Sequence, residues 1–134
     1  MTRFKDWKPP EFDVDGYTEY GWRCQHHENL RLGKNVDVGC YSYLNAKYGI
    51  IIEDECQIGS HCSLYTESTI DGKKGLILLK KNACVGTHST IMPHVVIGEN
   101  SIVAAHSFVP FSMSIPPNEI WGGVPARKIK EIER

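Results

Sequence analysis

Residues 79–115 read LKKNACVGTHSTIMPHVVIGENSIVAAHSFVPFSMSI, and an aliphatic side chain recurs there at every sixth position. The seven positions are Leu79, Val85, Ile91, Ile97, Val103, Val109 and Ile115. An α-helix repeats about every 3.6 residues and a two-faced strand about every 2, so neither produces this spacing. A parallel β-helix does, because each of its flat sides takes six residues and turns one large side chain inward. The spacing therefore predicts an all-β solenoid, a parallel β-helix.

The same phase extends upstream of residue 79, with two interruptions. It includes Ile52, Ile58, Leu64 and Ile70, preceded by Leu32, Val38 and Leu44. Two extra residues lie in the stretch from Tyr48 to Ile52, and three lie between Ile70 and Leu79. Fourteen inward positions at three per coil predict between four and five coils.

Two further positions of the repeat predict its corners. Four places after the aliphatic residues of the main stretch lie smaller side chains that avoid crowding the interior: Ala83, Ser89, Val95, Ser101 and Ser107. Three places after an aliphatic residue lie Asn35, Asn82 and Asn100. Asparagine tolerates left-handed backbone angles, so we expect a sharp turn at each of these positions.

The chain is long enough for one domain with three parts. Residues 1–30 carry no repeat and are expected to cap the first coil with Trp7, Tyr17, Tyr20 and Trp22. Residues 31–117 are expected to form the β-helix. Residues 118–134 are expected to form a C-terminal extension in which Pro125–Ile132 is a short amphipathic α-helix, with Pro125 at its first position.

Composition excludes several classes of partner. The 134 residues carry a formal net charge of -1 and no long basic run, so no nucleic-acid partner is expected. No apolar stretch approaches the roughly 20 residues of a membrane span, and the N-terminus lacks the apolar core of a signal peptide. The five cysteines form no CxxC pair, which is typical of reduced thiols. We therefore expect a cytoplasmic protein.

Two segments of the chain are similar to the C-terminal half of the hexapeptide-repeat acyltransferases. They are residues 97–107, IGENSIVAAHS, and residues 122–126, GGVPA, and the resemblance covers roughly residues 30–134. The branch that the chain resembles includes the galactoside and maltose O-acetyltransferases. The resemblance implies a left-handed β-helix, a homotrimer with acetyl-CoA in the cleft between subunits, and acetyl transfer to a hydroxyl or amine. The implied acceptor is a small sugar or nucleotide-sugar in polysaccharide biosynthesis.

The same resemblance implies four residues that bind the donor. Thr87 and Ala105 lie one 18-residue coil apart and match two positions that face the pantetheine arm. Gly123 belongs to the GGVPA segment, and Arg127 matches a basic position near the cofactor phosphates, where a positive charge suits an anion. Related enzymes usually carry Thr-Lys-Asp where this chain has residues 110–112, PFS, so one cofactor-facing lysine is absent.

Acyl transfer to a hydroxyl or amine needs a base, and histidine is the side chain best suited to neutral pH. In the maltose and galactoside enzymes the base is a histidine at the position that Ser68 or Thr69 occupies here. Four other histidines occupy the turn position of the repeat, where each could simply replace asparagine: His61, His88, His94 and His106. We select His88 as the catalytic base because it follows Thr87, and His61 as the second choice.

The polar segment from Glu67 to Gly75 interrupts the coil. It is either a solvated surface loop or an acceptor-binding loop that reaches across a subunit interface. In the second case we expect Glu67, Ser68 and Asp71 to contact the acceptor. Cys56 and Cys62 occupy inward positions, so packing explains them more simply than catalysis.

Two functions of other classes stay open. A zinc protein similar to the gamma-class carbonic anhydrases would use three histidines at a subunit interface, and His88 and His106 share one side of the predicted coil. A non-catalytic assembly subunit would instead use the flat coil faces for docking. The preferred prediction is an acetyl-CoA-dependent acyltransferase with no bound metal.

Overall fold

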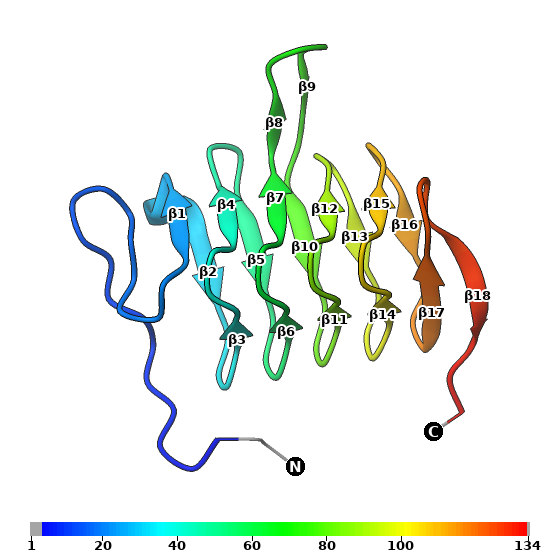
Figure 1. The fold of residues 1–134 in the computed structure, drawn as a ribbon, viewed down its shortest axis with the longest axis horizontal. Coiled ribbons are helices and arrows are strands. Elements are labelled where there is room, and N and C mark those ends of the chain that lie inside the picture. Colours follow the sequence, from blue (N-terminus) through cyan, green and yellow to red (C-terminus); the bar gives the residue numbers. More distant parts are fainter. Residues whose placement is uncertain (1–3, 134) are drawn as a thin grey trace.

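Three flat sheets form the walls of a solenoid in the computed structural model, which describes residues 4–133 (Figure 1). Apart from one hairpin and the last strand, successive strands along the chain fall on the first, second and third sheet in turn. Neighbours within a sheet are therefore strands one coil apart, and they pair in parallel. This arrangement is the parallel β-helix that the six-residue spacing predicted.

The strands of each sheet are short, as six residues per side require. Sheet 1 contains β1 (Arg23–Gln25), β4 (Tyr43–Asn45), β7 (Ser63–Tyr65), β12 (Thr90–Ile91) and β15 (Phe108–Val109). Sheet 2 contains β2 (Leu30–Leu32), β5 (Ile50–Ile52), β10 (Ile77–Leu79), β13 (Val96–Ile97) and β16 (Ser114–Ile115). Sheet 3 contains β3 (Asp37–Val38), β6 (Gln57–Ile58), β11 (Cys84–Val85), β14 (Ile102–Val103), β17 (Glu119–Gly122) and β18 (Arg127–Glu131).

The interior of the solenoid is a stack of aliphatic side chains. All seven aliphatic positions between residues 79 and 115 are buried, and so are the five smaller positions that follow them. Strand register places equivalent residues in line, with Ile52, Leu79, Ile97 and Ile115 paired successively in sheet 2. Full burial of each aliphatic side chain contributes about 1.5–3 kcal/mol, so the stack of buried aliphatic side chains is the main source of stability.

A protruding hairpin accounts for the interruption after Leu64. Strands β8 (Glu67–Ser68) and β9 (Lys73–Lys74) pair antiparallel and rise from the corner between sheets 1 and 2 (Figure 1). Ile70 lies in this hairpin with 98% of its surface exposed. Its assignment to the interior is wrong, because the coil continues from Leu64 directly to the strand that carries Leu79.

Residues with left-handed backbone angles form the three corners, as predicted for asparagine. Asn35, Asn82, Asn100 and Asn118 line one corner with φ between 58° and 64°. Asn82 Nδ2 donates to Asn100 Oδ1 over 2.8 Å, and Asn100 Nδ2 donates to Asn118 Oδ1 over 3.1 Å. The side-chain amides thus link successive coils at the corner between sheets 2 and 3.

The coils extend beyond the predicted limits of residues 31 and 117. β1 pairs in parallel with β4, and β17 pairs in parallel with β14. Before β1, Trp22 is buried, and the Trp7 Nε1–H donates to the Val36 carbonyl over 2.9 Å. These two indoles cover the first coil, and the short 3-10 helix η1 (His27–Asn29) follows β1.

The C-terminal segment is a strand, so the predicted α-helix over Pro125–Ile132 is wrong. β18 pairs antiparallel with β17, and Lys128 Nζ lies 3.4 Å from Glu119 Oε2. β17 would otherwise leave unpaired backbone groups at the end of sheet 3, and strand pairing satisfies them. Ile129 is exposed on β18 while Ala126, just before the strand, is buried, so the segment has no continuous apolar helical face.

Between residues 4 and 133 there is no helix with the length and apolar character to cross a bilayer.

Candidate active site

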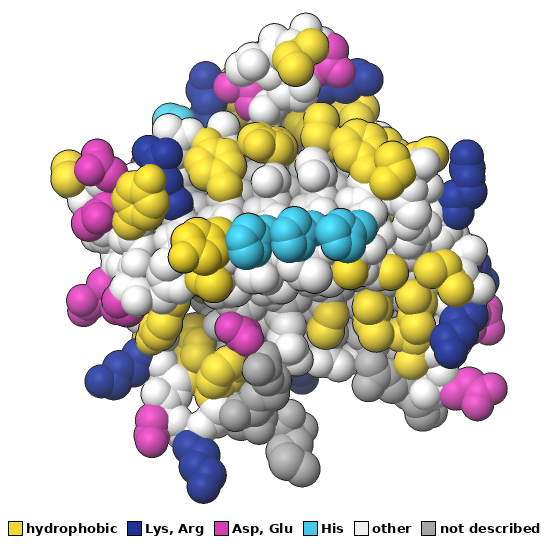
Figure 2. Space-filling model, viewed as in Figure 1, with side chains coloured by type: hydrophobic (Ala, Val, Ile, Leu, Met, Phe, Trp, Pro, Cys, Tyr) yellow, Lys and Arg dark blue, Asp and Glu magenta, His cyan; other side chains and the backbone are white. Residues whose placement is uncertain are grey.

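Four aromatic rings form a column along the corner between sheets 3 and 1. Tyr41, His61, His88 and His106 each have φ between 58° and 65°, so each residue projects outward from a left-handed turn. The ring centroids of His61 and His88 are 4.6 Å apart, and those of His88 and His106 are 4.9 Å apart. Tyr41 continues the column, with its centroid 5.0 Å from that of His61. Figure 2 shows the three histidine side chains as a row along the length of the solenoid.

We refer to His61, His88 and His106 as the histidine column. Hydrogen bonds distinguish His88 from the other two rings. Thr87 Oγ1 lies 2.9 Å from His88 Nδ1 and donates to the Ser60 carbonyl over 2.7 Å. Among the residues that the structure describes, His88 is the one member of the three stacked histidines whose ring nitrogen forms a hydrogen bond. The His88 side chain is exposed, so a substrate can reach its free edge.

The residues predicted to bind the donor gather beside the column. Register pairs Val85 with Val103 and Val103 with Trp121, so two positions further on Thr87, Ala105 and Gly123 lie in line. The Phe108 N–H donates to the Gly123 carbonyl over 2.9 Å, which fixes Gly123 at this end of the line. Arg127 pairs with Gly122 across β17 and β18. We refer to Thr87, Ala105 and Gly123 as the small-residue column.

A shallow hollow of about 430 Å³ lies on sheet 3 next to the small-residue column. Its lining includes Gly59, Ser60 and Gly86. A Cβ at Gly59 would approach the Thr87 backbone nitrogen to 2.7 Å, and a Cβ at Gly86 would approach the Ala105 nitrogen to 2.5 Å. Glycine is therefore required for the coils to approach here, and the lack of side chains leaves a flat path beside the histidines.

The residues predicted to bind the acceptor lie elsewhere within one subunit. Glu67, Ser68 and Asp71 belong to the hairpin at the corner between sheets 1 and 2, at the opposite end of β7 from His61. At a strand rise of about 3.3 Å per residue, the separation is roughly 15–20 Å. The structure therefore does not bring these three residues to the histidine column of the same chain.

Local contacts hold the hairpin itself. Glu67 Oε1 lies 3.3 Å from Lys47 Nζ, and Asp71 Oδ2 lies 3.5 Å from Lys73 Nζ. A hydrogen bond from Ser68 is the main cause that lowers the pKa of the exposed Asp71 carboxyl. The hairpin therefore presents the ionised Asp71 carboxylate at neutral pH.

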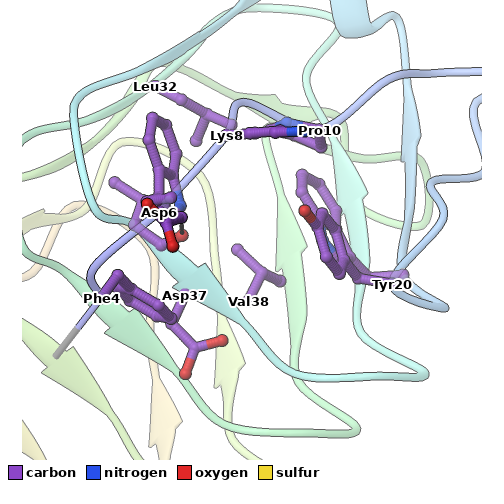
Figure 3. A pocket seen from close by; sticks show the side chains of 11 residues that line it. Phe4, Asp6, Lys8, Pro10, Tyr20, Leu32, Asp37 and Val38 are labelled. Carbon is purple, nitrogen blue, oxygen red and sulfur yellow. Dashed lines mark hydrogen bonds between the residues drawn. The ribbon is translucent and has the colours of Figure 1, made fainter.

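A separate cavity of about 180 Å³ lies under the N-terminal segment (Figure 3). Figure 3 shows Tyr20 on one side of it, Phe4 and Asp6 on the other, and Val38 between them. None of the residues predicted to bind the donor or the acceptor lines this cavity. The residues predicted to bind the donor therefore lie beside the histidine column, those predicted to bind the acceptor lie on the hairpin, and neither group lies at the cap.

Comparisons with known proteins agree with the fold. The bacterial transferase hexapeptide (six repeats) family matches residues 77–110. Galactoside O-acetyltransferase from Escherichia coli K12 is 31% identical over 115 residues, which are 75% of this chain and 56% of that protein. The structure of AntD, an N-acyltransferase from Bacillus cereus in complex with dTDP and 3-hydroxybutyryl-CoA, is 31% identical with a TM-score of 0.61. The alignment covers 85% of this chain and 71% of the AntD chain.

The chain belongs to the hexapeptide-repeat transferase family. A galactoside acetyltransferase in complex with coenzyme A is 26% identical to this hexapeptide-repeat protein, with a TM-score of 0.77, over 89% of this chain and 63% of that chain. The predicted family and the predicted left-handed β-helix are thereby confirmed. The hexapeptide-repeat protein spans little more than half the length of the curated relatives that it matches.

Two residues of the site in this hexapeptide-repeat protein were not selected from sequence. Tyr41 lies three places after Val38 and Ser60 lies two places after Ile58, so the repeat phase could have assigned both to the same corner as His88. His61 was selected only as a second base. The structure stacks it directly on His88, because the hairpin adds residues to the chain between them without shifting the coil.

Two cysteines in the interior of the solenoid are shielded from solvent. Cys56 and Cys62 have no exposed surface, and burial raises the pKa of the Cys56 thiol to about 12. Burial also raises the pKa of the Cys62 thiol. Neither is a reactive thiolate at neutral pH, in agreement with a packing role.

Proposed function

We propose that this hexapeptide-repeat protein is an acetyl-CoA-dependent acetyltransferase that acts on a hydroxyl or amine of a small acceptor. The observation that carries the proposal is the contact between two columns: Thr87 of the small-residue column hydrogen-bonds His88 of the histidine column. A donor that follows the small residues would bring its thioester beside an exposed imidazole.

The proposed donor site accounts for the small residues and the basic group. Thr87, Ala105 and Gly123 offer little side-chain bulk, so an extended pantetheine arm can lie along them. Arg127 supplies a positive charge near the end of the line, which suits the phosphates of the cofactor. The galactoside acetyltransferase and AntD structures, which are complexes with coenzyme A and an acyl-CoA, support the choice of donor.

In the proposed reaction, His88 is the general base. Its ring nitrogen takes the proton from the acceptor hydroxyl or amine as the acceptor oxygen or nitrogen attacks the thioester carbonyl carbon. The carbon–sulfur bond then breaks, and the imidazolium returns its proton to the leaving thiolate of coenzyme A. A positioned base of this kind contributes about 10²–10⁴ in rate.

We propose a sugar or nucleotide-sugar as the acceptor, within polysaccharide biosynthesis in the cytoplasm. Two observations support this class. One relative is named a galactoside O-acetyltransferase, and the AntD structure contains dTDP. On the present chain, Glu67, Ser68 and Asp71 offer carboxylate and hydroxyl groups that can hydrogen-bond sugar hydroxyls or an amine.

We propose a homotrimer, because the hairpin and the histidine column lie at opposite ends of sheet 1 within one chain. A closed cyclic assembly could bring the hairpin of one subunit to the column of its neighbour. Ile70 is 98% exposed on the hairpin, and an intersubunit contact would give it an apolar partner.

Zinc chemistry at the histidine column fits the ring geometry poorly. The His88 and His106 rings are within 12° of parallel and 4.9 Å apart, so their nitrogen lone pairs lie in separate parallel planes. One ion at about 2.0–2.1 Å from both nitrogens would need at least one ring to turn. Stoichiometric zinc in the purified protein, with hydratase activity lost on chelation, would support that rival.

A thiol-release assay tests the proposed function directly. Acetyl-CoA is incubated with the protein and a panel of nucleotide-linked amino sugars and free sugars, and free coenzyme A is measured. We expect acceptor-dependent thiol release with at least one member of the panel. A stable complex with another protein, together with no binding of acetyl-CoA, would instead support a non-catalytic assembly subunit.

A further inference from the structure

The Thr87 hydroxyl has three neighbours that decide where its single proton goes. Its Oγ1 lies 2.7 Å from the Ser60 carbonyl oxygen, 2.9 Å from His88 Nδ1 and 3.3 Å from Ser60 Oγ. A carbonyl oxygen can only accept a hydrogen bond. An oxygen–oxygen contact of 2.7 Å without a proton would be repulsive, so the hydroxyl must donate to the Ser60 carbonyl.

The proton on His88 follows from that assignment. Because the Thr87 proton is committed to Ser60, the contact with His88 Nδ1 is a hydrogen bond only if Nδ1 is the donor. We infer that Thr87 is a positioning residue that holds neutral His88 as the Nδ1–H tautomer, with the lone pair on Nε2. An unconstrained histidine in water favours the opposite tautomer, with the proton on Nε2.

Stacking supports the same orientation of the ring. His61 lies on one face of His88 with an interplanar angle of 5°, and His106 lies on the other face at 12°. Both faces of the His88 ring are therefore covered, and its Nδ1 edge is held by Thr87. The Nε2 edge is left for the acceptor, and this last step rests on the proposed function.

No other ring of the column has this arrangement. The residue before His106 is Ala105, which has no hydroxyl, and the His61 ring forms no hydrogen bond within the described residues 4–133. His94 Nδ1 lies 2.8 Å from Ser112 Oγ at another corner. Within residues 4–133 the Ser112 hydroxyl donates to no carbonyl, so it does not fix the His94 tautomer, and this pair serves as a control.

Nitrogen NMR tests the tautomer without any assay of activity. Protein labelled with ¹⁵N in histidine is measured by long-range proton–nitrogen correlation at about pH 9, where unperturbed imidazoles are neutral. The His88 signals are assigned by their absence in His88→Asn, which keeps a residue suited to the left-handed turn. We expect the Nδ1–H pattern for His88 in the wild type and in Thr87→Ser. We expect a shift toward the Nε2–H pattern in Thr87→Ala, and no change at His88 in Ser112→Ala.

Two results would overturn the inference: an Nε2–H pattern for His88 in the wild type, or an Nδ1–H pattern that persists in Thr87→Ala. Thermal unfolding of each variant shows whether the coil is intact. If Thr87→Ala does not fold, Thr87→Ser and the wild type still decide the tautomer.

Kinetics then tests whether the tautomer matters for catalysis. We expect Thr87→Ala to lower kcat about tenfold or more, within the range that a general base supplies, and Thr87→Ser to restore it. A raised KM for acetyl-CoA with unchanged kcat would mean that Thr87 only lines the donor site, and would contradict the positioning role. Absence of acetyl transfer in the wild type would remove the proposed function while leaving the NMR result to stand by itself.

Discussion

His61 and His88 stack with ring centroids 4.6 Å apart and planes within 5° of each other, although 27 positions separate them in the chain. In two successive coils without an insertion, equivalent residues at this corner are 18 positions apart, as for His88 and His106. The additional residues belong to the hairpin, which leaves the coil and returns to it without changing the register. The site thus draws its histidines from three successive coils of one rigid scaffold.

Replacement of His88 tests its role as the base. We expect His88→Asn to lower kcat about 100-fold or more, because the variant keeps a turn-compatible residue and loses the proton acceptor. His106→Asn, the matched change one coil away, should have a much smaller effect, because the His106 ring lies beside Ala105 and has no hydroxyl to orient it. Steady-state thiol release measures both, and equal rates for the wild type and His88→Asn would refute the assignment.

Removal of the basic group tests the donor site. Arg127→Ala should raise the KM for acetyl-CoA about tenfold with little change in kcat, since a charge-assisted contact to phosphate is worth roughly 1.5–3 kcal/mol when complete and less on an exposed strand. Lys130→Ala removes a positive charge from the same strand and is the control. Similar KM values for the two variants would show that only the overall charge matters.

A pair of isoleucines tests the fold. Ile91 is fully buried, and Ile91→Ala should lower the free energy of unfolding by about 2–5 kcal/mol. Ile70→Ala is the same chemical change at a residue 98% exposed, and we expect an effect within about 0.5 kcal/mol for the isolated subunit. Urea unfolding of both variants supplies the comparison. A large loss for Ile70→Ala that depends on protein concentration would reveal a contact between subunits at the hairpin.

The buried thiols predict a lower stability of the fold at alkaline pH. Burial raises the pKa of the Cys24 and Cys56 thiols to about 12, from the ordinary value of 9.0 that applies in the unfolded chain. Between these values the unfolded chain releases protons that the folded chain keeps, so the free energy of unfolding falls as pH rises above about 9. We expect a lower urea midpoint at pH about 10 than at pH about 8. The variant Cys24→Ala with Cys56→Ala should show a smaller difference between the two pH values, and an unchanged difference would contradict the cause.

The six-residue spacing was sufficient to predict the interior and the corners. Each six-residue side turns an aliphatic side chain inward at the same position, so the pattern at Leu79, Val85 and Ile91 has few structural alternatives. The pattern could not separate a buried isoleucine from Ile70, because a hairpin can enter at any corner and one aliphatic residue can fall in phase by chance.

The C-terminal strand shows a second limit of local patterns. The spacing of Ala126, Ile129 and Ile132 fits a helix, but the segment lies beside the last strand of sheet 3, and backbone pairing there decides its conformation. At the site, the 18-residue spacing correctly aligned His88 with His106. It did not reveal the hydrogen bond between Thr87 and His88, since that depends on side-chain rotamers at one corner.

A crystal structure with coenzyme A bound would decide whether the donor lies along the small-residue column beside His88. We expect the pantetheine arm beside Thr87 and Ala105, with its sulfur next to the His88 ring and its phosphates toward Arg127. Coenzyme A bound instead in the cavity under the N-terminal segment, or on the hairpin away from any histidine column, would contradict it.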